Sequence, residues 1–189
     1  MRIVPTILLL ALLTPAVGAA EPDASWRAAA GLPDLAAIGQ PAPAALLGQR
    51  LAGRWQGSLL YRDFGTDRGV TLPTDVAISG ASAALQLAFT YDDGPGKTVR
   101  SNEQWSLAGN GTTFGTGKSA APMAVSLYRG NGDGDLALVA IGEGVENDVQ
   151  VAVRMVVLRR GTSLHISRST RLPDGVWLLR HVYRLALVQ

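Results

Sequence analysis

From Trp55 to the C-terminus, the sequence is a succession of short segments in which apolar and polar residues alternate, separated by Gly, Asp and Pro. Alternation of period two places every second side chain on one face of a strand, whereas a helix needs apolar residues three or four positions apart. No stretch of this region has a clear helical period. The region therefore predicts an all-β domain.

We expect about 8–10 strands, because segments of strand length recur with turn residues between them. They are residues 55–62, 70–79, 85–91, 98–107, a short strand around Phe114, 123–128, 136–141, 149–158, 164–170 and 176–188. Pro73 cannot donate a ladder hydrogen bond and indicates an edge or a bulge. Short connections favour an up-and-down antiparallel barrel, since closure removes exposed strand edges. A partly open barrel or a two-sheet sandwich is the alternative.

The segment 149–158 is apolar on both faces around a single cation, Arg154. One face can fill a barrel interior, and the other needs a cover. Residues 21–50, which we call the arm, are rich in Ala and Pro and predict at most a short helix. Either the arm or a second copy in a homodimer is expected to cover the outer face of the barrel domain, residues 51–189.

The N-terminus has the pattern of a secretory signal peptide. Arg2 precedes an apolar stretch from Ile3 to Leu13, and the small residues 16–20 follow. We predict cleavage after Ala20 and a periplasmic or extracellular protein. The apolar stretch is shorter than the ~20 residues of a membrane-spanning helix, so no integral membrane span is expected.

Composition narrows the chemistry further. The chain has no cysteine, which excludes disulfides, thiolate sites and a lipoprotein anchor. Its 17 Lys and Arg nearly balance its 15 Asp and Glu and are scattered, so no nucleic acid partner is expected.

Catalytic and metal patterns are also missing from the sequence. There are only two histidines, His165 and His181, and no Gly-x-Ser-x-Gly turn. The oxygen-rich run from Asn131 to Asp135 lacks the glutamate that would complete a calcium loop and is better interpreted as a polar hairpin. We therefore predict no catalytic residues, no metal site and no cofactor.

Both ends of the barrel domain resemble the calycin superfamily, which includes lipocalins and fatty-acid-binding proteins. Gly53-Arg54-Trp55 opens the first strand, and Arg180 and Arg184 lie on the last. The resemblance implies a lipocalin-like barrel closed by a basic residue of the final strand stacked on Trp55, so the closure residues would be Gly53, Trp55, Arg180 and Arg184. The segment His181-Val182-Tyr183 is similar to the Arg-x-Tyr that holds a carboxylate in fatty-acid-binding proteins, with His in place of Arg.

The strand faces and this resemblance give six candidate ligand-binding residues: Tyr61, Glu103, Trp105, Arg168, His181 and Tyr183. Glu103 shares a face with Trp105. If that face is interior, its carboxylate needs a partner such as Arg154 or Arg168; if the strand is flipped, Glu103 is solvated.

Three functions remain open from the sequence. The first is an exported barrel that holds an apolar or amphipathic small molecule in its interior. The second is a non-enzymatic interaction module of the cell envelope, for instance a homodimer. The third is a calycin-shaped enzyme, a hydrolase or isomerase.

Overall fold

The structure is a computed structural model that describes residues 35–63, 65–66, 68–117, 121–171 and 175–188. The predicted signal peptide, residues 1–20, and the first part of the arm lie outside the described residues. No helix in the described part of the chain is long and apolar enough to cross a bilayer.

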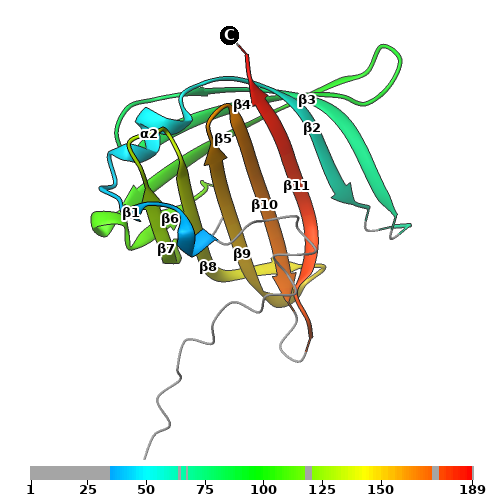
Figure 1. The fold of residues 1–189 in the computed structure, drawn as a ribbon. Coiled ribbons are helices and arrows are strands. Elements are labelled where there is room, and N and C mark those ends of the chain that lie inside the picture. Colours follow the sequence, from blue (N-terminus) through cyan, green and yellow to red (C-terminus); the bar gives the residue numbers. More distant parts are fainter. Residues whose placement is uncertain (1–34, 64, 67, 118–120, 172–174, 189) are drawn as a thin grey trace, which may run out of the picture.

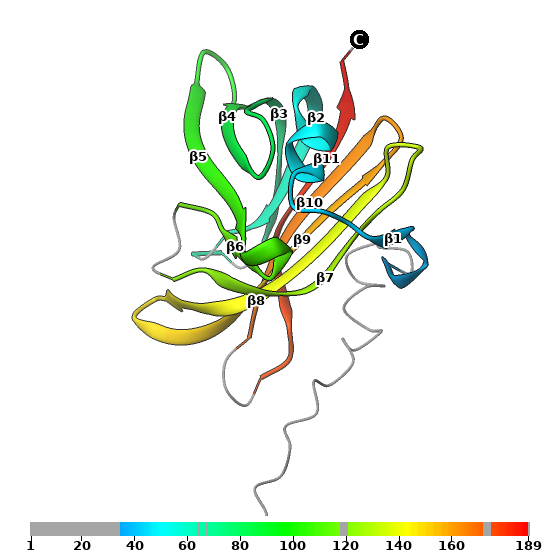
Figure 2. The ribbon, with the colours of Figure 1, turned by 90° about the vertical axis from the view of Figure 1, so that its left-hand side faces the viewer.

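The fold is one antiparallel sheet that closes into a ten-stranded barrel (Figures 1 and 2). The ten strands are β2 (Gly53–Arg62), β3 (Gly69–Ser79), β4 (Ala84–Asp92), β5 (Thr98–Ala108), β6 (Thr113–Gly115), β7 (Met123–Gly130), β8 (Leu136–Glu146), β9 (Val149–Arg160), β10 (Ser163–Arg171) and β11 (Leu178–Leu187). Each strand pairs with the next along the chain, and β11 pairs with β2. The predicted all-β, up-and-down barrel is confirmed.

A few short elements lie outside the ring. β1 (Gln40–Pro41) pairs with β7 as an extra strand. The remaining elements are η1 (Leu35–Ala37), α2 (Leu46–Leu51) and η2 (Gly109–Gly111). Within the described residues, the arm therefore forms short helical turns and a two-residue strand.

Two local features show how the sequence shapes the strands. Pro73 pairs with Ser58 of β2, whereas β3 begins to pair with β4 only at Thr74, so Pro73 lies where β3 is an edge, as predicted. β8 runs to Glu146 and not, as predicted, to Ile141. The strand continues through Gly142, where a Cβ would lie 2.6 Å from Cγ of Met123, so this glycine lets β8 pass close to β7 beside it.

One end of the barrel is filled with apolar side chains. Leu47 and Leu51 of α2 are fully buried and join the interior core beside Trp55. The indole Nε1 of Trp55 donates a hydrogen bond to the Leu51 carbonyl oxygen, 2.9 Å away. Gly53, at φ +144°, starts β2 in a conformation that favours glycine. This packing leaves the opposite half of the barrel as the place where an interior cavity can form.

We expected the cation that covers Trp55 to come from the last strand, but it comes from another strand. Arg159 of β9 lies over the indole, 5.6 Å from the ring centroid. Arg184 is exposed on the outer face of β11, because its neighbours Tyr183 and Leu185 point into the core. Arg180 adjoins His181, which pairs with Tyr61 at the far end of β2 from Trp55. Strand alternation and register thus rule out the stacking predicted for both arginines.

The outer face of β8 and β9 is covered by the chain itself. Leu35 and Ile38 are buried and pack on apolar residues of these strands, Ala137, Val139, Val156 and Leu158. Arg154 also points to this outer side, where the residue is 3 % exposed and its guanidinium stacks 3.8 Å above the centroid of Trp177. The arm, one of the two covers considered from the sequence, therefore occupies this surface.

Candidate functional site

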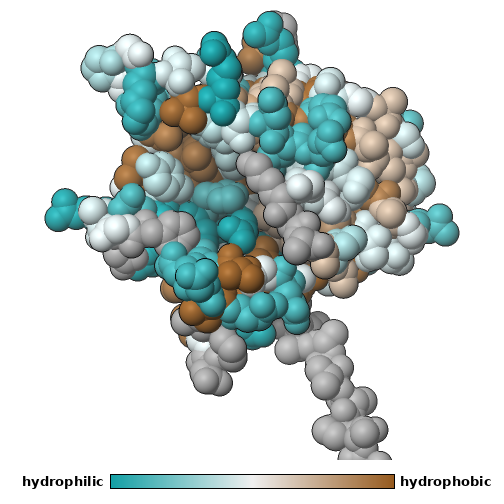
Figure 3. Space-filling view, turned by 180° about the vertical axis from the view of Figure 1, so that it is seen from behind, coloured by the Kyte–Doolittle hydropathy of each residue, from teal (hydrophilic) through white to brown (hydrophobic). Residues whose placement is uncertain are grey.

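The barrel encloses a partly open cavity of about 340 Å³ in the half away from Trp55. Side chains of β4, β5, β9, β10 and β11, together with Thr116 after β6, form its walls. They are Phe89, Tyr91, Glu103, Trp105, Thr116, Val153, Met155, Ile166, Arg168, His181 and Tyr183. Seen from behind, the molecular surface is hollowed, and hydrophilic residues lie in the hollow next to hydrophobic ones (Figure 3).

Strand alternation explains why charged residues face this interior. Leu164 and Ile166 of β10 belong to the interior core, so Arg168 two residues later points the same way. On β11, Tyr183 and Leu185 are in the core, and His181 continues that face. Arg168 and His181 are direct partners across the two strands, which brings their Cβ atoms to roughly 5 Å.

Aromatic rings form one wall of the cavity. The ring centroids of Phe89 and Tyr183 are 5.1 Å apart, and the hydroxyl oxygens of Tyr91 and Tyr183 are hydrogen-bonded at 2.9 Å. His181 contacts Tyr183 edge to face at 5.5 Å. Burial raises the pKa of the Tyr183 hydroxyl, and the neighbouring Tyr91 raises it further. Both tyrosines are therefore neutral hydrogen-bonding groups at physiological pH.

Glu103 faces the cavity, so of the two orientations considered for its strand, the one with Glu103 on the interior face is found. The indole Nε1 of Trp105 donates to Glu103 Oε2 at 3.0 Å. Trp105 is itself buried and packs edge to face on Phe114, with ring centroids 5.4 Å apart. Of the two cations suggested as partners of Glu103, Arg168 lines the same cavity, and Arg154 lies on the outer side of the barrel.

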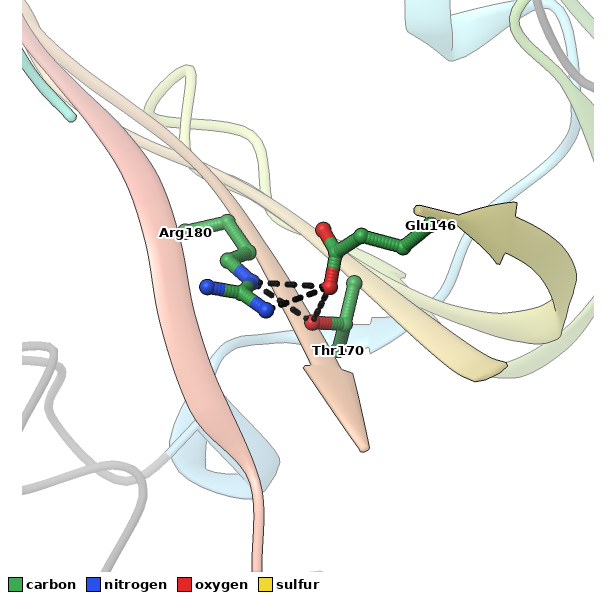
Figure 4. A network of polar contacts seen from close by, with 3 residues as sticks. All are labelled: Glu146, Thr170 and Arg180. Carbon is green, nitrogen blue, oxygen red and sulfur yellow. Dashed lines mark hydrogen bonds and ion pairs between the residues drawn. The ribbon is translucent and has the colours of Figure 1, made fainter. Parts of the chain in front are cut away.

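A polar network lies along the strands next to the cavity (Figure 4). Arg180 contacts Glu146 Oε2 through Nε at 3.0 Å and through Nη2 at 2.5 Å. The hydroxyl of Thr170 donates to the same carboxylate oxygen at 2.9 Å. This network joins β8, β10 and β11. Its residue on β10, Thr170, follows Arg168 by two positions, and its acidic residue, Glu146, is the last residue of β8.

Five of the six predicted ligand-binding residues are brought together in the interior cavity: Glu103, Trp105, Arg168, His181 and Tyr183. Tyr61 does not line this cavity. It pairs with His181 across β2 and β11, and both residues line a second, more open cavity together with Arg62 and Arg180.

Several wall residues were not named from the sequence. Phe89 and Tyr91 lie on the apolar face of β4, and the aromatic content of that face was a usable signal. Thr116 follows a three-residue strand in a glycine-rich turn, where no pattern marks the direction of a side chain. Among the described residues, no group of three or more His, Asp or Glu side chains is placed to hold a metal ion.

Comparison with known proteins supports the fold. No protein-family model and no curated protein matches this chain. Among solved structures, the S-type phycobiliprotein lyase of Guillardia theta is similar, with a TM-score of 0.53 and 8 % sequence identity over 78 % of this chain and 93 % of the lyase. This chain has a calycin-like barrel fold. At such low identity the likeness concerns the fold alone.

Proposed function

We propose that this protein is exported and binds one amphipathic small molecule inside its barrel. The observation that carries the proposal is the interior cavity of about 340 Å³, in which aromatic and charged side chains converge while the other end of the barrel is filled. Ligand sites typically combine apolar walls with a few polar groups that fix orientation, in cavities of about 300–1,000 Å³. The cavity matches this description and is of a size for one small ligand.

Binding is tested on the purified full-length chain. Native mass spectrometry shows whether a small molecule co-purifies, and titration with the neutral dye N-phenyl-1-naphthylamine measures binding through dye fluorescence. Trp105 lines the cavity, so a bound dye lies against its indole. We therefore expect Trp105→Phe to change the affinity for the dye, and Trp177→Phe, on the outer side of the barrel, to leave that affinity unchanged. Absence of both a co-purified molecule and dye binding would refute the proposed function.

Export is tested separately, because binding and location are independent. The full-length chain is expressed in a Gram-negative host, and the periplasmic fraction is analysed by intact-mass spectrometry. We expect a product that begins at Glu21, as the pattern of residues 1–20 predicts. An uncleaved protein retained in the cytoplasm would contradict export and leave the binding proposal standing.

A further inference from the structure

We infer that the ligand is a compact aromatic anion whose acidic group is bound by Arg168. This inference rests on the proposed function, since it names the class of molecule that the interior cavity holds. It starts from the charge that faces the cavity.

Arg168 is a half-buried cation that the described part of the chain leaves without a partner. Its guanidinium forms no hydrogen bond or ion pair with any described residue, although it points into the barrel and lines the cavity. Withdrawing a charge from water without a partner is unfavourable. An arginine in this position is therefore ready to form a bidentate pair with a carboxylate or sulfonate.

The nearby carboxylates are already engaged. Glu146 is held by Arg180 and Thr170 through the network of Figure 4. Glu103 accepts the hydrogen bond of the Trp105 indole. Because Glu103 and Glu146 have these partners, we take an anion from outside the chain as the partner of Arg168.

The remaining walls define the rest of the ligand. Phe89, Trp105 and Tyr183 present aromatic surfaces, which bind flat rings by stacking and edge contacts. A volume of about 340 Å³ is near the lower limit of ligand cavities, which favours one compact ring system over a long alkyl chain. The carboxylate of Glu103 repels the acidic group of the ligand. The anionic end of the ligand is therefore directed to Arg168, and His181 is the cross-strand neighbour of Arg168.

A matched pair of dyes tests the inference. 1-Anilinonaphthalene-8-sulfonate and N-phenyl-1-naphthylamine share one ring skeleton, and only the first has an anionic group. We expect the wild-type protein to prefer the sulfonate. The variant Arg168→Met keeps a long apolar side chain and should weaken sulfonate binding about tenfold or more, since hydrogen bonds to charged groups are strong, while binding of the neutral dye changes little.

The control variant is Arg100→Met, the same substitution at an exposed position of β5. It should bind both dyes like the wild type, and unchanged thermal unfolding should show that both variants are folded. If Arg168→Met binds the sulfonate as tightly as the control does, the anion site is refuted while binding of the neutral dye still supports the proposed function. If neither dye binds the wild type, the proposed function itself fails.

Competition addresses the shape of the ligand. Naphthalene-2-carboxylate and hexadecanoate both have one carboxylate but differ in body. We expect the naphthalene acid to displace the bound sulfonate dye at a concentration at least about tenfold lower, because flat rings match the aromatic walls. Displacement by hexadecanoate at an equal or lower concentration would overturn the compact aromatic class.

Discussion

Gly57 offers a direct test of how the barrel closes between β2 and β11. It pairs with Leu185, and a Cβ at this position would lie 2.1 Å from the carbonyl oxygen of Arg184 and 3.0 Å from the Leu185 Cα. These are backbone atoms, so they can yield only if the two strands move apart. The φ angle of Gly57 is not in the positive range, so Gly57→Ala tests this close approach alone.

Gly57→Ala should therefore destabilise the protein. Overpacking costs about 1–3 kcal/mol, and the reduced freedom of the unfolded chain returns roughly 0.5 kcal/mol, so we expect a net loss of about 1.5 kcal/mol. For a chain of this size that corresponds to a decrease in Tm of about 3–6 °C. Urea unfolding followed by tryptophan fluorescence should show a lower midpoint with an unchanged slope.

The control for this experiment is Gly69→Ala. Gly69 also lies in a strand without positive φ, but a Cβ there would meet only Cδ1 of Leu60, at 3.4 Å. We expect its stability to stay within about 0.5 kcal/mol of the wild type. Equal stabilities for the two alanine variants would refute the close approach of β2 and β11 at Gly57.

Three further outcomes are expected. Burial, and secondarily Arg184, lowers the pKa of His165 to about 4, below its value of about 6.5 in the unfolded chain. The free energy of unfolding should therefore fall by up to about 3 kcal/mol as the pH drops from 6.5 to 4. In urea unfolding, the variant His165→Gln should not show this dependence of stability on pH. The Tyr91 and Tyr183 hydroxyls satisfy one another, so each single Phe variant should lose about 1 kcal/mol, and a double-mutant cycle should show that the double variant loses less than the sum. Phe114 is fully buried in the shortest strand of the ring, and Phe114→Ala should lower the free energy of unfolding measured in urea by about 3–5 kcal/mol.

The strands could be predicted from the sequence because alternation is a local property. The same alternation placed Glu103 and Trp105 on one face, and the structure shows both in the cavity. Arg168 could also be suggested, because an interior carboxylate needs a cation nearby. The local pattern of the sequence therefore identified Glu103 and Arg168, two of the charged residues of the candidate site.

Contacts between distant segments could not be predicted in this way. A register shift between Arg168 and Ser169 turns Leu179 to the outer face, although simple alternation puts it on the face of His181. The cation over Trp55 is Arg159 of β9, which lies more than a hundred residues further along the chain. From the sequence alone, many other arginines were equally good candidates for this contact. Such features depend on how strands twist and shift against each other, which one sequence does not display.

The pairing of β2 with β11 also affects how the molecule is made. Trp55 pairs with Leu187, so the ring cannot close until β11, which follows the other nine strands of the ring along the chain, has left the ribosome. Contacts of such large sequence separation slow folding, and until they form, two strand edges remain open to other chains. A variant with a weakened β11 should therefore aggregate more readily during refolding than the wild type, because those two edges stay exposed for longer.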